Sequence, residues 1–331
     1  VSRVINGHSN VRDSTREQVM RAIRKLDYIP NAAAKSLASA RTSRIALIYT
    51  NPSTAYLSEL LVGALRGTAR TAVQLVIDSW DHFGDEARRS AARALAKSVA
   101  GVILPPPLCE SRVVVPELIK AGVPVVAIAS GRSSYNISRV RIDDFAAGKE
   151  VTEYLVALGH TRIGFIKGHP NLTASVRRFE GFNAALSEAG IAADDGLVQQ
   201  GYFTYRSGLK AAEKLLSRRH APSAIFASND DMAAAVVSVA YRLGLEVPED
   251  LSVVGFDDTS AATTTWPELT TVRQPIASMA QSAIDIMLHS IQHRDGEPRI
   301  VVDKVVDYAL IKRDSVAGPR SAGRRRTTKR T

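Results

Sequence analysis

At 331 residues the chain is long enough for two domains of ordinary size, and its 45% apolar and 23% charged residues are typical of a globular protein with a buried core. It contains no run of 18 apolar residues, which excludes an apolar membrane-spanning segment, and its first residues do not resemble a secretory signal. The single cysteine, Cys109, excludes an internal disulfide and is typical of a protein of the reducing cytoplasm, where we expect this chain to act.

The formal net charge of +10 is concentrated at the two ends of the chain. Residues 1–43 contain eight basic and three acidic residues, and residues 317–331 contain six basic and no acidic ones, so the long middle is nearly neutral. Basic ends on a neutral body are typical of a protein whose ends touch a polyanion. A disordered tail is predicted over 315–331, and its arginines either attract DNA without sequence preference or are simply solvated.

The first predicted element is a helix over residues 14–26. Ser14 and Glu17 form a capping box, and apolar side chains then recur every three to four residues. Before it, residues 1–5 are predicted to be the end of another helix. After it, the Ala-rich residues 31–40 predict a short helix that needs a partner surface to be stable.

From residue 44 onward the pattern alternates between strands and helices. Nearly continuous apolar runs predict strands over 45–49, 73–77, 102–104, 123–129, 163–166, 224–227 and 251–256. Amphipathic stretches predict helices over 57–69, 85–98, 145–158, 175–189, 206–217 and 231–243. This order predicts an α/β fold with two lobes, each a doubly wound parallel sheet, and a ligand site at the carboxyl ends of the strands.

Several sequence phrases together resemble the lactose/galactose-repressor (LacI/GalR) family of transcriptional regulators. They are VSRVINGHSNVRDSTREQVMRAIRKLDYIPNAAAKSLAS, DDFAAGKEVTEYLVALGHTRIGFIKG, RRFEGFNAAL, AIFASNDDMAAAVV, EDLSVVGFDDTSAA and PELTTVRQP. They follow the family's order and cover residues 1 to about 313. The resemblance implies a small-molecule sensor with a periplasmic-binding-protein-like body behind a helix-turn-helix headpiece.

The resemblance also implies the domain boundaries. Those expected are a partial all-α headpiece over 1–30, a hinge over 31–42, an effector-binding and dimerisation domain over 43–314, a first lobe over about 43–142 and 274–303, and a second lobe over about 143–273 and 304–314. Family headpieces open with a helix that braces the recognition helix, whereas this chain begins inside the recognition helix. We therefore hypothesise that the natural start lies upstream of Val1.

The resemblance implies that the headpiece and hinge contact operator DNA. The residues that match contact positions of the family are Ser2, Arg3, Asn6, Arg12, Ser14, Thr15, Asn31, Ala34 and Leu37. Arg3 and Asn6 would read base edges, whereas Arg12, Ser14 and Thr15 would bind phosphate. Leu37 would open the minor groove, and Ala34 would pack against the hinge of the partner subunit. The alternatives are a solvated helix end capped by Asn6, and ordinary packing of Leu37.

For the small-molecule site, the resemblance selects polar and aromatic residues at strand ends and loops. They are Tyr56, Leu57, Asp143, Arg178, Phe203, Asn229 and Asp257. Carboxylates, an amide, a guanidinium and an aromatic wall suit a polyhydroxylated ligand, which favours a sugar or sugar derivative, while a purine stays possible. The alternatives are helix capping by Asp143, Asn229 and Asp257, a surface role for Arg178 with Arg177 in its place, and core packing of Tyr56 and Phe203.

Two other classes of function are compatible with an α/β fold. The sequence has no phosphate loop, nucleophile elbow or zinc-protease motif, and His289 and His293 lack a third ligand, so we expect no enzyme, no cofactor and no metal. An extracytoplasmic sugar-binding protein of the same body fold is the alternative, but it leaves the basic first 43 residues unexplained. The sequence therefore predicts a repressor-type regulator, a homodimer or else a tetramer, whose ligand closes the lobes and changes its affinity for DNA.

Overall fold

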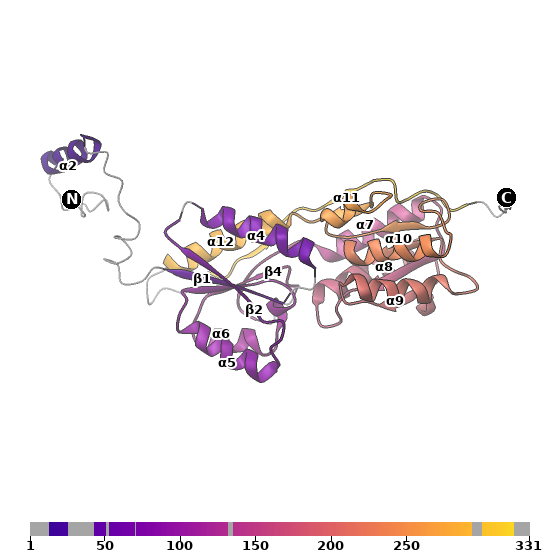
Figure 1. The fold of residues 1–331 in the computed structure, drawn as a ribbon, viewed down its shortest axis with the longest axis horizontal. Coiled ribbons are helices and arrows are strands. Elements are labelled where there is room, and N and C mark those ends of the chain that lie inside the picture. The colour runs from indigo at the N-terminus through magenta and orange to yellow at the C-terminus, as the bar shows by residue number, and fades with distance from the viewer. Residues whose placement is uncertain are drawn as a thin grey trace. The chain divides into compact units, whose positions relative to one another are not determined.

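The computed structural model describes residues 13–25, 43–50, 53–69, 71–131, 135–292 and 300–320. The chain separates into two compact units, one formed by residues 1–43 with 72–74 and the other by the remainder. In the first unit lies α2 (Asp13–Lys25), the helix predicted over 14–26. The second unit contains two parallel sheets, which confirms the predicted α/β class (Figure 1).

Lobe 1 is built on a six-stranded sheet in the order β11-β5-β4-β3-β1-β2. Its strands are β1 (Arg44–Tyr49), β2 (Gln74–Ser79), β3 (Gly101–Leu104), β4 (Val125–Ile128), β5 (Ser138–Arg141) and β11 (Asp303–Val305). Its helices are α4 (Thr54–Thr68), α5 (Asp85–Ala96), α6 (Val114–Lys120) and α12 (Ile276–Gln292). Figure 1 shows α4 and α12 on one face of the sheet and α5 and α6 on the other, so the central strands are buried on both faces, as their apolar runs require.

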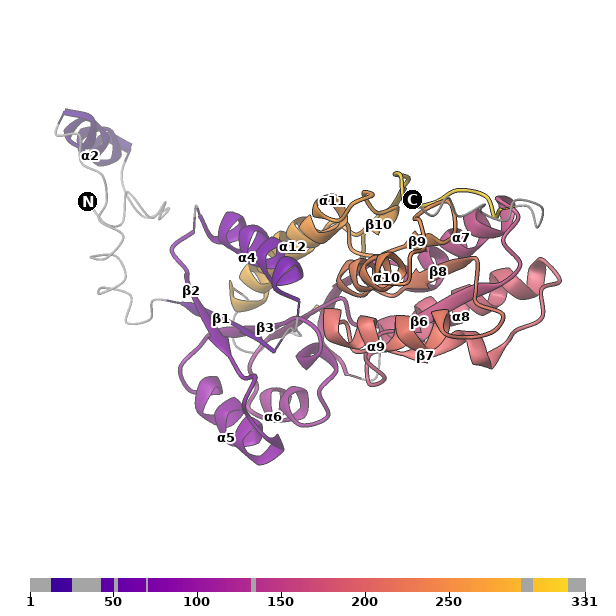
Figure 2. The same ribbon diagram turned by 45° about the vertical axis from the view of Figure 1, so that its right-hand side comes forward.

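Lobe 2 is built on a four-stranded parallel sheet in the order β7-β6-β8-β9. Its strands are β6 (Ile163–Lys167), β7 (Val198–Gln200), β8 (Ala224–Ala227) and β9 (Ser252–Val254). Its helices are α7 (Asp144–Ala157), α8 (Thr173–Glu188), α9 (Tyr205–Leu216) and α10 (Asp230–Arg242), arranged around the sheet in Figure 2. Helix α7 packs along α8, and α9 packs along α10.

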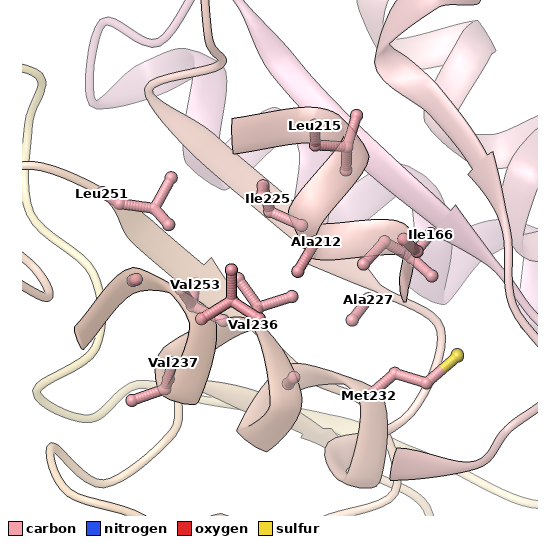
Figure 3. Packing of buried hydrophobic residues seen from close by; sticks show 14 of the residues in the cluster. Ile166, Ala212, Leu215, Ile225, Ala227, Met232, Val236, Val237, Leu251 and Val253 are labelled. Atoms are coloured by element: carbon pink, nitrogen blue, oxygen red, sulfur yellow. The ribbon is translucent and has the colours of Figure 1, made fainter. Parts of the chain in front are cut away.

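The core of lobe 2 forms because successive strand residues point to opposite faces of the sheet. On one face, Ile166 and Ile225 pack with side chains of α9 and α10, such as Leu215 and Val236 (Figure 3). On the opposite face, the neighbouring Phe165 packs against aromatic rings, including Phe182 of α8. The central strands of the lobe 2 sheet are therefore buried on both faces, which holds their ends in fixed positions.

The chain passes between the lobes more than once. After lobe 2's last strand it forms β10 (Thr271–Arg273) and then α12, which packs on lobe 1. Strand β11 pairs with β5, after which β12 (Ala309–Ile311) returns to pair antiparallel with β10. Ser315 then donates a hydrogen bond to the Val253 carbonyl oxygen of β9. Within the part of the chain that the structure describes, no helix has the length and apolarity to cross a membrane.

Candidate functional site

A cavity of about 60 Å³ lies between the two lobes. It is lined by Ser53, Tyr56, Pro106, Pro107, Ala129, His169, Leu172, Arg178, Tyr202, Phe203, Asn229, Asp257 and Gln274. Several of these residues come shortly after a strand: Ala129 directly follows β4, Asn229 follows β8 after one residue, and Asp257 follows β9 after two residues. The cavity therefore lies at the carboxyl ends of both parallel sheets, where open α/β folds bind ligands.

The Arg178 side chain is held in the cavity wall by several contacts. It lies on α8 and is 4% exposed, its Nε donates to Asp144 Oδ1 at 2.8 Å, and one of its Nη atoms donates to the Ser228 carbonyl oxygen at 2.7 Å. Its guanidinium also lies 3.5 Å from the centre of the Phe256 ring. Arg177, the other candidate, is exposed and pairs with Glu180 on the helix surface. The inward-facing arginine is therefore Arg178.

Asp257 provides the carboxylate of the cavity. Its Oδ1 lies 4.0 Å from Nη1 of Arg178 and accepts a hydrogen bond from Nε2 of Gln274. Burial raises the pKa of Asp257 well above its ordinary value, while the charge of Arg178 opposes that rise. The carboxylate is thus oriented by the hydrogen bond from Gln274 and by the nearby charge of Arg178, and it lines the cavity.

Two buried polar atoms of the cavity wall have no hydrogen-bond partner among the described residues. They are the hydroxyl of Tyr56 and Oε1 of Gln274. Burial raises the pKa of the Tyr56 hydroxyl, so this group stays protonated and can donate. Buried polar groups are nearly always paired in folded proteins, and unpaired ones at a cavity indicate where a bound molecule makes its hydrogen bonds. A donor and an acceptor next to a carboxylate suit the hydroxyl groups of a ligand.

Asn229 and Phe203 form the wall on the lobe 2 side. The Asn229 Oδ1 accepts from Met232 N at the start of α10, and its Nδ2 donates to the Phe203 carbonyl oxygen at 3.1 Å. Phe203 has a φ angle of 60°, and a Cβ atom at Gly168 would lie 1.9 Å from its ring. Asn229 therefore caps α10, as the alternative interpretation held, and also fixes the aromatic residue beside it.

Two of the predicted contact residues do not line this cavity. Leu57 lies one position after Tyr56 on α4 and is half-buried. Asp143 is exposed at the start of α7, where its carboxylate accepts from the backbone N–H groups of Phe145 and Ala146. The carboxylate that faces inward is its neighbour Asp144, which pairs with Arg178. For Asp143, the capping alternative describes what the structure contains.

Several lining residues were not predicted from the sequence. They are Ser53, Pro106, Pro107, Ala129, His169, Leu172, Tyr202 and Gln274. Their position after a predicted strand was a usable signal for some of them, because Pro106 follows β3 and His169 follows β6. Gln274 directly follows β10, in the phrase TVRQP.

Of the predicted DNA contacts, Ser14 and Thr15 lie in the first turn of α2 and are exposed. The other seven, namely Ser2, Arg3, Asn6, Arg12, Asn31, Ala34 and Leu37, lie outside the described residues. The Nδ1 of His289 donates to the Asp285 carbonyl oxygen within its own helix, and His293 is not among the described residues. No group of three potential metal ligands occurs within the described ranges.

Comparison with known proteins connects this geometry to one group of proteins. Residues 1–31 match the family described as bacterial regulatory proteins, lacI family, and residues 152–316 match a periplasmic binding protein-like domain. Catabolite control protein A of Priestia megaterium is 35% identical over 91% of this chain and 91% of its own length. The ribose operon repressor of Escherichia coli is 33% identical over 88% of each protein.

Solved structures match over a similar extent. The complex of the transcriptional regulator CelR with cellobiose has a TM-score of 0.75 and 32% identity, and the match covers 95% of this chain and 94% of that one. The lac repressor dimer bound to operator and the anti-inducer ONPF has a TM-score of 0.73 and 26% identity, over 96% of this chain and 94% of that one. The similarity therefore extends over nearly the whole chain.

Proposed function

This chain belongs to the LacI family of bacterial regulatory proteins, and we propose that it represses transcription as a homodimer on operator DNA, with an affinity controlled by a small molecule in the interlobe cavity. The observation that carries the proposal is the cavity itself. A buried guanidinium, a carboxylate and two unpaired polar atoms converge there from both lobes, so a ligand that contacts all of them favours one arrangement of the lobes.

We further propose that the effector is a sugar or sugar derivative. The two unpaired polar atoms and Asp257 offer a donor and acceptors to hydroxyl groups, and the Phe203 ring supplies an apolar wall. A relative of this chain is named for the ribose operon, and a similar structure is a cellobiose complex. The sequence also allows a purine. A purine carries fewer hydroxyl groups than a sugar, so it would use fewer of the donors and acceptors that the cavity offers.

The basic first 43 residues supply the DNA-binding part of the proposal. Residues 1–30 act as headpiece and 31–42 as hinge, with Arg3, Asn6 and Leu37 as the principal contacts to bases and groove. The lac repressor structure that resembles this chain is a dimer on operator. The relatives are transcriptional regulators, so we propose that the chain has no catalytic activity and acts in the cytoplasm, and not as the extracytoplasmic binding protein.

A two-part binding experiment tests the proposal. The protein is screened by thermal shift against monosaccharides, disaccharides and purines, because a ligand that binds only the folded state raises the Tm. Duplexes are then selected from random DNA, and their affinity is measured with and without the ligand found. We expect a sugar to raise the Tm and to change the DNA affinity at least tenfold. A protein that binds no duplex at low salt, or whose DNA affinity ignores every stabilising ligand, contradicts the proposal.

A further inference from the structure

Glu110 receives hydrogen bonds from both lobes. It ends the short helix η1 (Leu108–Glu110) of lobe 1 and is 4% exposed. Its Oε1 accepts from Ser130 Oγ at 3.1 Å and from the Gly131 backbone N–H at 2.9 Å, both in lobe 1. Its Oε2 accepts from the backbone N–H and the hydroxyl of Thr173, at 2.8 and 2.9 Å, and Thr173 belongs to lobe 2. One buried carboxylate thus joins the two lobes.

Thr173 is the first residue of α8, and this helix lacks a cap of its own. The residue before it, Leu172, has no side-chain oxygen and makes no capping hydrogen bond. The first N–H groups of a helix need acceptors, and negative charge near them is favourable. Glu110 provides both from the opposite lobe. The start of α8 is therefore capped by this carboxylate only while the lobes are together.

The same helix carries the arginine of the cavity. Arg178 lies five residues after Thr173, and Leu172 lines the cavity directly. The lobes are closely packed at this point, since a Cβ atom added to Gly131 would lie 2.6 Å from the Thr173 side chain. Any movement of lobe 1 away from lobe 2 therefore breaks the two bonds between Glu110 and Thr173 and uncaps the helix on which Arg178 is mounted.

We propose that Glu110 is a positioning residue for the effector site: it holds the start of α8 across the cleft and stabilises the closed arrangement of the lobes in which Arg178 meets the ligand. Glu110 and Thr173 also border a wide groove of 860 Å³ at the mouth of the cleft. Water enters this groove. When the lobes part, water molecules therefore replace the interlobe hydrogen bonds. Glu110 does not line the cavity itself, and its effect on the ligand passes through α8.

The apparent ligand affinity follows from this arrangement. A ligand that binds only the closed arrangement has an apparent Kd equal to its intrinsic Kd divided by the closed fraction. In Glu110→Gln the side chain keeps its shape, but it loses its charge, and its amide N–H₂ cannot accept from the backbone N–H groups of Gly131 and Thr173. We expect a smaller closed fraction, an apparent affinity about tenfold weaker, and faster ligand release.

Distances between the lobes test the proposal without any ligand. Cysteines introduced for spin labels at Ser90 on α5 and Lys210 on α9 are exposed, whereas the native Cys109 is buried and can remain. We expect Glu110→Gln to shift the distance distribution towards longer values. Glu117→Gln is the matched control, because Glu117 pairs with Arg89 and Arg93 within lobe 1. A distribution in Glu110→Gln that overlays the unmutated protein overturns the proposal.

Thr173→Ala provides a second variant if Glu110→Gln fails to fold. It removes one hydroxyl donor and leaves the helix intact, so we expect a smaller shift of the same sign. In the double variant the two shifts should not add, because both changes break the same contact. An unchanged distribution in Thr173→Ala, or simple additivity, overturns the proposal. The ligand arm uses cellobiose as its probe and rests on the proposed function. If cellobiose does not bind while the distances shift, only the proposed sugar class fails.

Discussion

At the scale of single residues, several residues that line the cavity have backbone conformations that ordinarily cost free energy. Ala129, Phe203 and Asp257 line it, with φ angles of 54°, 60° and 110°. Residues other than glycine rarely adopt such angles, and they keep them where the surrounding structure holds them there. Each of the three lies just after a strand, at a turn that directs the chain along the cavity wall. The site is therefore shaped by the folded sheets before any ligand arrives.

We expect Asp257→Ala to weaken ligand binding at least tenfold, because it removes the cavity's carboxylate and leaves the Gln274 amide without its acceptor. Isothermal titration with the effector measures the change. Asp143→Asn is the control: it lies outside the cavity and retains a side chain that caps α7, so affinity and Tm should stay the same. DNA affinity in the absence of ligand should be unchanged in both variants. Equal loss of ligand binding in the two variants would contradict the assignment of Asp257 to the site.

We expect the stability of the fold to depend on pH through Asp230. It is 1% exposed at the start of α10, and burial raises its pKa to about 7, although hydrogen bonds donated by Thr259 and Thr271 oppose the rise. In the unfolded chain the same group ionises near pH 4. Between these two values the unfolded state has lost the proton that the folded state still holds, so the free energy of unfolding falls as the pH rises through this window and levels off above it.

Asp230→Asn tests this dependence, since an amide keeps the shape of the side chain and cannot ionise. We expect the free energy of unfolding of the unmutated protein to decrease from about pH 5 to about pH 8, and the decrease to be smaller in the variant. Urea denaturation at the two pH values measures both. Identical pH dependence in the two proteins would remove Asp230 as its source.

At the scale of elements, lobe 1 depends on the close approach of α4 and α12. A Cβ atom added to Gly63 would lie 2.0 Å from the backbone oxygen of Ala277, and one at Gly67 would lie 2.8 Å from the Ile284 side chain. We expect Gly63→Ala to lower the free energy of unfolding by about 1–3 kcal/mol, because the helices must separate. Gly84→Ala, where an added Cβ meets nothing within 4 Å, should have almost no effect. Urea denaturation compares the two, and equal stabilities would contradict the packing.

Strands could be predicted from the sequence where they are buried on both faces. The buried strands β1, β6 and β8 lie within one residue of their predicted positions, as do helices α9 and α10. None of the missed strands is buried along its whole length as β8 is, so the rule for strands covered on both faces does not detect them; they are β5, β7, β10, β11 and β12. Strand β11 is also exposed along its whole length, so it has no apolar run to detect.

The segments that form the candidate site could be predicted from the sequence. The residue of each segment that faces the cavity could not always be predicted. Tyr56 faces the cavity while Leu57 does not, and Asp144 reaches Arg178 while Asp143 caps α7. Successive side chains on a helix point in directions about 100° apart. A prediction that is wrong by one position therefore selects a residue on a different side of the helix. Glu110 had no sequence signal, because its partners come from the loop after β4 and from the start of α8, which only the folded lobes bring together.

At the scale of the whole molecule, charge and burial divide the chain in the same way. The basic residues concentrate in the first 43 positions, whereas the apolar clusters of both lobes are built from residue 46 onward. A protein with this division binds two different partners, DNA mainly through charge and a small molecule mainly through hydrogen bonds. Affinity for DNA phosphate falls steeply with salt because bound counterions are released, whereas hydrogen bonding of a neutral sugar in a buried cavity is nearly insensitive to salt.

A chain that begins at Ser43 isolates the second of these activities. It retains every residue of the two lobe cores and every residue that lines the cavity, so we expect it to fold and to bind the effector with a Kd within about twofold of that of the 331-residue chain. It lacks the eight basic residues of the first 43 positions, so its affinity for operator at low salt should fall by a factor of 1,000 or more, to about that of nonspecific binding. Titrations of both chains with effector and with operator, each at several salt concentrations, measure the two effects. Retained operator binding in the shortened chain would assign DNA recognition to the lobes, and lost effector binding would show that the cleft depends on the residues removed.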